Sequence, residues 1–96
     1  MTSLNDIERT LSSQKNQLAS RFGVKRLAIF GSYARNEQHR DSDVDILVEF
    51  DTPVGIEFID LANFLEDILE VRVDLVSRNG IKPKYFNKIQ PDLRYV

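Results

Sequence analysis

The sequence predicts an α/β domain in which helices cover a small mixed β-sheet. Two segments carry apolar residues at helical spacing, and three shorter segments are continuous apolar runs or alternate between apolar and polar residues. The expected elements, in chain order, are helix 3–22, strands 24–30 and 43–50, helix 55–70, strand 71–76, a short helix 83–90 and a terminal strand 93–96. A chain of 96 residues suits one domain spanning 1–96 with a modest core.

The first helix has clear start and stop signals. Ser3 with Asp6 resembles an N-cap pair, and Gly23 is placed to end the helix. Its apolar stripe favours core packing, and a partner-binding face is the alternative. The stripe consists of Leu4, Ile7, Leu11, Leu18 and Phe22.

The next two strands flank a polar segment. Strand 24–30 ends in a fully apolar run, which indicates burial on both faces, and Gly31 breaks it. After a short helical turn and a polar loop, strand 43–50 alternates, so that Asp43 and Asp45 share one face. Their Cα atoms should lie roughly 6.6 Å apart, from the rise of a strand. The other face of this strand is predicted core: Val44, Ile46, Val48 and Phe50.

The second half of the chain supplies a covering helix and a third strand. Helix 55–70 has a wide apolar face, which suits packing on a sheet. Strand 71–76 alternates, and Asn79-Gly80 turns the chain into helix 83–90. Strands joined through a helix are usually neighbours, so strand 71–76 is expected beside strand 43–50.

Composition excludes several classes of protein. The net charge of −2 argues against a long nucleic acid as the main partner, because such partners demand a basic surface. No apolar run approaches the roughly 18 residues of a membrane helix. No signal peptide is recognisable, so a cytoplasmic location is the default expectation. The absence of cysteine removes disulfides and thiolate metal sites and says little about the compartment.

Three aspartates on the predicted strands form a candidate metal site. Asp43 and Asp45 share a face, and Asp74 would project beside them from the neighbouring strand. Magnesium takes hard oxygen ligands and keeps some waters, so converging carboxylates with substrate phosphates would satisfy it. Close unpaired carboxylates repel one another, which also favours a bound cation. The alternative is that the aspartates are surface residues at strand ends.

Gly31 and Ser32 form a candidate phosphate site. Glycine permits close approach of the backbone to a ligand, and N–H groups at the start of a helix can hold phosphate oxygens. Arg35 and Arg40 flank this turn and can contact phosphate; the alternative is that each is a solvated loop residue. The alternative is a simple tight turn with Ser32 as N-cap. P-loop and Rossmann glycine patterns are absent, and the EF-hand glycine position is occupied by Ile46.

The combined pattern resembles a known family. Gly31-Ser32, ten intervening residues and then Asp43-Val44-Asp45 are similar to the G-S-x10-D-x-D signature of the DNA polymerase beta nucleotidyltransferase superfamily. The string GSYARNEQHRDSDVDILVEF looks like that of the minimal nucleotidyltransferases, and Asp74 fits the third carboxylate. The resemblance covers Leu27 to Leu75 closely. It implies the palm-like nucleotidyltransferase fold.

The resemblance also implies an activity and a set of roles. A nucleoside triphosphate, ATP by preference, would bind with two magnesium ions and give its nucleoside monophosphate to an acceptor hydroxyl. Asp43, Asp45 and Asp74 would ligate the metals, and Asp74 would also help to deprotonate the acceptor. The triphosphate would be held by the turn residues, Gly31, Ser32 and Arg35.

Many minimal members are antitoxins paired with a helical HEPN ribonuclease toxin, and some attach AMP to a toxin tyrosine. The main hypothesis is therefore an enzyme of this kind that acts on a partner protein. The alternatives are a binding module that neutralises its partner by contact and a plain structural domain. One departure from the family is Asn36, where glycine is usual; asparagine tolerates the left-handed backbone conformation better than most residues.

Overall fold

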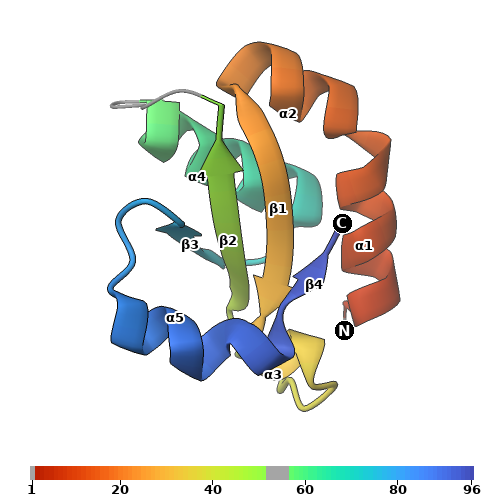
Figure 1. Ribbon diagram of the computed structural model, residues 1–96. Coiled ribbons are helices and arrows are strands. Elements are labelled where there is room, and N and C mark those ends of the chain that lie inside the picture. The colour runs from red at the N-terminus through yellow and green to blue at the C-terminus, as the bar shows by residue number, and fades with distance from the viewer. Residues whose placement is uncertain (1, 52–56) are drawn as a thin grey trace.

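The computed structural model describes residues 2–51 and 57–96, which form a four-stranded mixed sheet with helices on both faces (Figure 1). The strand order is β3-β2-β1-β4, with β1 antiparallel to both of its neighbours and β2 parallel to β3. The strands are β1 Val24–Phe30, β2 Val44–Phe50, β3 Val73–Ser77 and β4 Arg94–Tyr95. The predicted α/β architecture is therefore confirmed.

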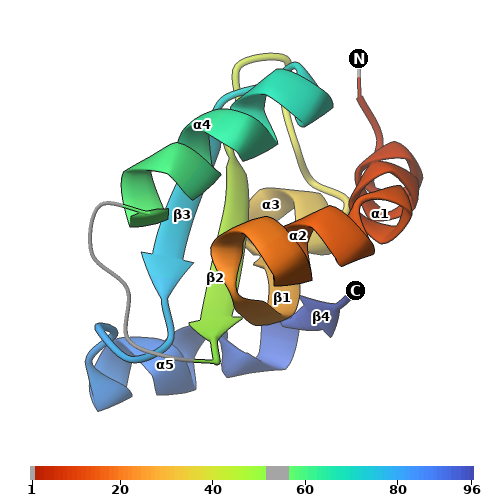
Figure 2. The ribbon, with the colours of Figure 1, turned by 90° about the horizontal axis from the view of Figure 1, so that it is seen from above.

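The helices divide between the two faces of the sheet, and Figure 2 shows α4 and α5 on opposite sides of it. They are α1 Leu4–Ser13, α2 Lys15–Phe22, α3 Gly31–Ala34, α4 Glu57–Leu69 and α5 Pro83–Ile89, followed by the 3₁₀ turn η1 Gln90–Asp92. The main core lies under α1, α2 and α4. A smaller core, in which Ile89 of α5 contacts Ala28, Phe30 and Leu47, fills the other side.

The first predicted helix is two helices, so the expectation of one continuous element over 3–22 was wrong. The break lies at Gln14, whose φ of −108° and ψ of 10° are not helical. Just before it, the Ser13 hydroxyl donates a hydrogen bond of 2.7 Å to the Thr10 carbonyl. Such side-chain bonds offer the backbone an alternative to the helical ladder. The helices turn at this point, and Leu11 and Leu18 both reach the main core.

Most other expected features are confirmed with small shifts of boundary. Ser3 and Asp6 form a reciprocal capping box, and Gly23 ends α2 in the left-handed conformation with a φ of 66°. The third strand begins two residues later than predicted, and the first two residues of helix 55–70 lie outside the described residues. Within the described part of the chain, no helix is long and apolar enough to cross a membrane.

The sheet topology gathers three strand ends at one edge. β1 ends at Phe30 and runs antiparallel to β2, which begins at Val44. β3 runs parallel to β2 and begins at Val73. The segment after β1 and the starts of β2 and β3 therefore lie together, and this edge carries the predicted site.

Candidate active site

Asp45 and Asp74 are register partners on the parallel strands β2 and β3. Residues opposite each other on neighbouring strands place their side chains on the same face of the sheet. On its other side, Asp45 lies opposite Phe30, the last residue of β1. The expected proximity of the third aspartate to the D-x-D pair is therefore present in the fold.

The electrostatics of this edge disfavour a charged Asp45. Its pKa is raised from 3.8 to about 6, first by partial burial and then by the negative charges of Asp74 and Asp43. A hydrogen bond with the Asp74 carboxyl raises it further, whereas the positive charge of Arg35 lowers it. The raised pKa means that the protein's own cations do not compensate the charge of an ionised Asp45, which is the condition in which a bound cation is favourable.

Gly31 lies directly against the side chain of Asp45. Its φ of 75° lies in the left-handed region, and a Cβ atom at this position would overlap the Oδ2 atom of Asp45. Glycine is therefore required both by the backbone conformation and by the carboxylate beside it. α3 starts at Gly31, so the first N–H groups of that turn have no partner within the helix. Ser32 lies inside α3 and Phe30 holds the N-cap position, so the alternative of Ser32 as N-cap was wrong.

Asp43 is adjacent to the Asp45–Asp74 pair but is held by an arginine that the sequence reading did not single out as part of the site. The Nε of Arg72 lies 3.2 Å from Oδ1 of Asp43, and the Asp43 side chain is 46% exposed. Arg72 also donates a hydrogen bond of 3.4 Å from Nη2 to the carbonyl of Asp41. Arg72 stands just before β3, so it reaches Asp43 only because β2 and β3 are neighbours.

Arg35 is tied to the C-terminal segment. Its Nε donates a hydrogen bond of 3.0 Å to Glu37, and its Nη1 donates one of 2.6 Å to Oδ2 of Asp92. These two carboxylates raise the pKa of Arg35. Asp92 belongs to η1 and is 57 residues away in sequence, so no local pattern indicated that it approaches the site.

The loop after α3 contains the left-handed backbone conformation that was expected at Asn36. Asn36 adopts a φ of 59°, so it takes the left-handed conformation that the family's usual glycine would allow. His39 and Arg40 are exposed. The backbone N–H of His39 donates a hydrogen bond of 2.8 Å to the Ser42 hydroxyl, which shapes the loop rather than forming a ligand set.

The carboxylates of the site would suit a magnesium ion that takes its other ligands from the substrate. Asp45 and Asp74 supply carboxylate oxygens at one point of the sheet edge, and magnesium usually takes only one or two protein carboxylates. Across residues 2–51 and 57–96, no three His, Cys, Asp or Glu side chains are already arranged around a single point. Asp43 would join the pair by exchanging Arg72 for the ion. The remaining ligands would be phosphate oxygens and water.

A family model described as the nucleotidyltransferase domain matches residues 11–96. The chain belongs to this family. The matched region contains Gly31 and all three aspartates, so the site lies within it. The predicted membership of the nucleotidyltransferases is therefore confirmed, and the chain is an enzyme of nucleotidyl transfer.

The nucleotidyltransferase is similar along its whole length to an archaeal protein adenylyltransferase. It is 42% identical over 97 residues to protein adenylyltransferase MntA of Thermococcus cleftensis, and the alignment covers 100% of this chain and 98% of that protein.

Two solved structures share the fold. A provisionally named minimal nucleotidyltransferase superposes with a TM-score of 0.82 at 32% identity, covering 97% of this chain and 95% of that one. A chain from a structure of a toxin–antitoxin with AMP-PNP has a TM-score of 0.70 at 27% identity, covering 98% of this chain and 72% of that one.

Proposed function

We propose that this nucleotidyltransferase moves AMP from ATP, with magnesium, onto a hydroxyl of a partner protein, and that the partner is a HEPN-type toxin for which it serves as antitoxin. The observation that carries the proposal is the Asp45–Asp74 pair with Gly31 packed against it. A sheet edge of this kind would combine carboxylates that bind a cation with backbone N–H groups that bind phosphate.

The roles of the carboxylates follow from their positions. Asp45 and Asp74, joined by Asp43, would hold the magnesium ions. Bound magnesium would neutralise the charge of the triphosphate and of the departing pyrophosphate. Asp74 is exposed and on the outer of the two strands, so it would be open to an acceptor that approaches this edge of the sheet. Its carboxylate would take the hydroxyl proton as the acceptor oxygen bonds to the α-phosphorus and the bond to pyrophosphate breaks.

The α3 turn would position the triphosphate. Because Gly31 has no Cβ, the Asp45 carboxylate lies directly against the turn, which would place a metal-binding group beside the N–H groups that hold phosphate. The N–H groups of the turn and the Ser32 hydroxyl would donate hydrogen bonds to the phosphate oxygens. Arg35 would contribute positive charge at the same end of the site, with its guanidinium held in place by Asp92 and Glu37.

A protein acceptor is favoured by several observations. The relative from Thermococcus cleftensis is named a protein adenylyltransferase, and one similar structure is a toxin–antitoxin with AMP-PNP. The described helices and strands form one sheet and the layers that cover it, and they leave no second wall around an acceptor. A partner protein would therefore supply much of the acceptor's surroundings. The alternative, a non-catalytic antitoxin that acts by contact, gives no reason to keep Gly31 and the three aspartates together.

The test is transfer of label to a co-expressed partner. The purified chain, magnesium and each of four labelled triphosphates are incubated with that partner, and adducts are mapped by mass spectrometry. The expected result is a mass gain of one nucleoside monophosphate on a partner hydroxyl, largest with ATP. Label on RNA or on a small molecule, with the partner unmodified, would overturn the proposal. Toxin neutralisation by an Asp45→Asn variant that transfers nothing would favour the contact alternative.

A further inference from the structure

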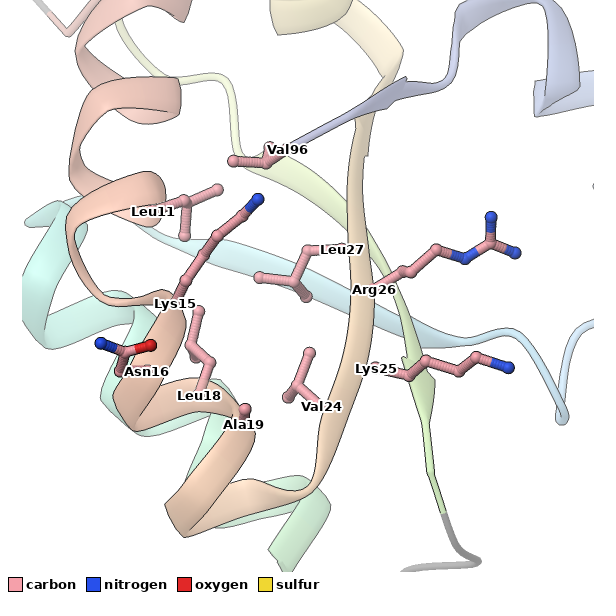
Figure 3. A pocket seen from close by; sticks show the side chains of 10 residues that line it. All are labelled: Leu11, Lys15, Asn16, Leu18, Ala19, Val24, Lys25, Arg26, Leu27 and Val96. Atoms are coloured by element: carbon pink, nitrogen blue, oxygen red, sulfur yellow. The ribbon is translucent and has the colours of Figure 1, made fainter.

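A cavity of about 370 Å³ lies well away from the aspartates, between helices α1 and α2 and the first half of β1 (Figure 3). Its base is apolar and continuous with the main core, because Leu11, Leu18 and Leu27 are buried members of that core. Val96 lies at one end, next to the chain terminus. The lining residues are Leu11, Lys15, Asn16, Leu18, Ala19, Val24, Lys25, Arg26, Leu27 and Val96.

The wall formed by β1 is an open strand edge. β4 pairs with β1 only at Ala28 and Ile29, and the N–H of Val96 adds one hydrogen bond of 3.0 Å to the Leu27 carbonyl. In the described part of the chain, Val24 and Arg26 therefore have strand partners on the β2 side alone, and the register shifts between them at Lys25. An unpaired edge is a template for an added strand, and β4 already shows the direction that such a strand would take.

The charge around the cavity has one sign. Its lining includes three basic residues and no acidic one. Figure 3 shows Lys15 extending across the cavity toward Val96, while Lys25 and Arg26 extend from the other side of β1. Arg26 is already neutralised by Glu49, at 2.7 Å, and its guanidinium lies over the Tyr95 ring. Lys15 and Lys25 form no ion pair with any described residue, so their charges are available to a partner.

We propose that this cavity is a docking site for an extended, acidic segment of the acceptor protein. The segment would add to the β1 edge alongside Val24–Arg26, place β-branched side chains over Leu18 and Val24, and present the carboxylates of its alternate residues to Lys25 on the opposite side of β1. The identification of that protein as the acceptor rests on the proposed function. The docking site is separate from the transfer centre, because Lys25 near the start of β1 and Gly31 just after its end are six residues apart, or about 20 Å at strand rise. It would therefore select the acceptor without touching the reacting groups.

Binding is tested without nucleotide or magnesium, so its outcome is independent of transfer activity. The probe is an end-blocked peptide of four Glu-Val repeats, titrated into isotope-labelled chain and followed by NMR amide shifts. Shifts are expected in Val24–Leu27 and Lys15–Ala19. Lys25→Glu should weaken binding about fivefold or more, the size of a lost ion pair. Ala19→Arg, which fills the mouth of the cavity from an exposed helix position, should abolish binding.

Matched controls separate docking from general charge attraction. Lys84→Glu makes the same charge change on α5, outside the cavity lining, and Ser20→Arg adds the same side chain beside the cavity-lining position Ala19. Both should bind the peptide as the wild type does, and a Lys-Val peptide should not bind. The proposal is overturned by equal shifts with the Lys-Val peptide, by no shifts at millimolar peptide, or by a preference for single-stranded RNA. A dimer that Ala19→Arg dissociates would also overturn it, since the occupant would then be a second copy.

Discussion

Asp45 and Asp74 are register partners on adjacent parallel strands, and Asp74 is one of the groups that hold the pKa of Asp45 at about 6. The pairing is a property of the sheet rather than of a mobile loop, because each aspartate sits within its strand. The fold therefore maintains a site in which the ionised form of Asp45 is disfavoured unless a cation binds beside it.

The first prediction concerns stability and pH. The folded-state pKa of Asp45 lies above its unfolded value, so its contribution to stability is complete below about pH 4 and is lost as the pH rises through about 6. Asp45→Asn removes this loss and should raise the free energy of unfolding at pH 7 by roughly 1 kcal/mol, reduced from the full linkage value by solvent screening. Urea unfolding at pH 4 and pH 7 measures the effect. Equal changes at the two pH values would contradict the titration of Asp45.

A second prediction uses two glycines with similar backbone conformations. Gly31 and Gly23 both have positive φ, of 75° and 66°, but a Cβ at Gly23 meets nothing within 4 Å. Gly23→Ala should cost about 1 kcal/mol of stability, the usual penalty for alanine in this region, and should leave nucleotide binding intact. Gly31→Ala should cost more and should also abolish nucleotide binding, because its Cβ displaces Asp45. Thermal unfolding and nucleotide titration of both variants check this, and equal behaviour would refute the close fit at Gly31.

The third prediction separates Asp74 from the nucleotide. If the exposed Asp74 acts as the base for the acceptor hydroxyl, as proposed, Asp74→Asn should reduce transfer by about 10² to 10⁴-fold, the usual value of general-base assistance, with a smaller loss of triphosphate affinity. Turnover of radiolabelled nucleotide and direct binding measurements give the two quantities. Unchanged transfer would make Asp74 a structural residue only.

A fourth prediction concerns the link between Arg35 and Asp92. If Asp92 orients Arg35 toward the triphosphate, Asp92→Asn should raise KM for the nucleotide more than it lowers kcat. The same substitution should have little effect when Arg35 is already Gln, because the two act through one contact. Asp51→Asn, at an exposed carboxylate, serves as the control. Additive effects in the double variant would show that Asp92 acts independently of Arg35.

The parts of the site that sequence predicted are those with local or periodic signals. Alternation in strand 43–50 placed Asp43 and Asp45 at a strand start, and helix-mediated connection predicted β2 and β3 as neighbours. The contacts of Arg72 with Asp43 and of Arg35 with Asp92 depend on tertiary placement and have no such signal. The break at Gln14 was also missed, because neither glycine nor proline marks it.

The magnesium–nucleotide site is tested most directly by calorimetric titration of magnesium and a non-hydrolysable ATP analogue. The wild-type chain is compared with the Asp43→Asn, Asp45→Asn double variant, whose folding is verified separately. The expected result is magnesium-dependent binding in the wild type and none in the variant, although the variant is at least as stable. Equal binding in both proteins, or binding that does not depend on magnesium, would contradict the assignment of these aspartates.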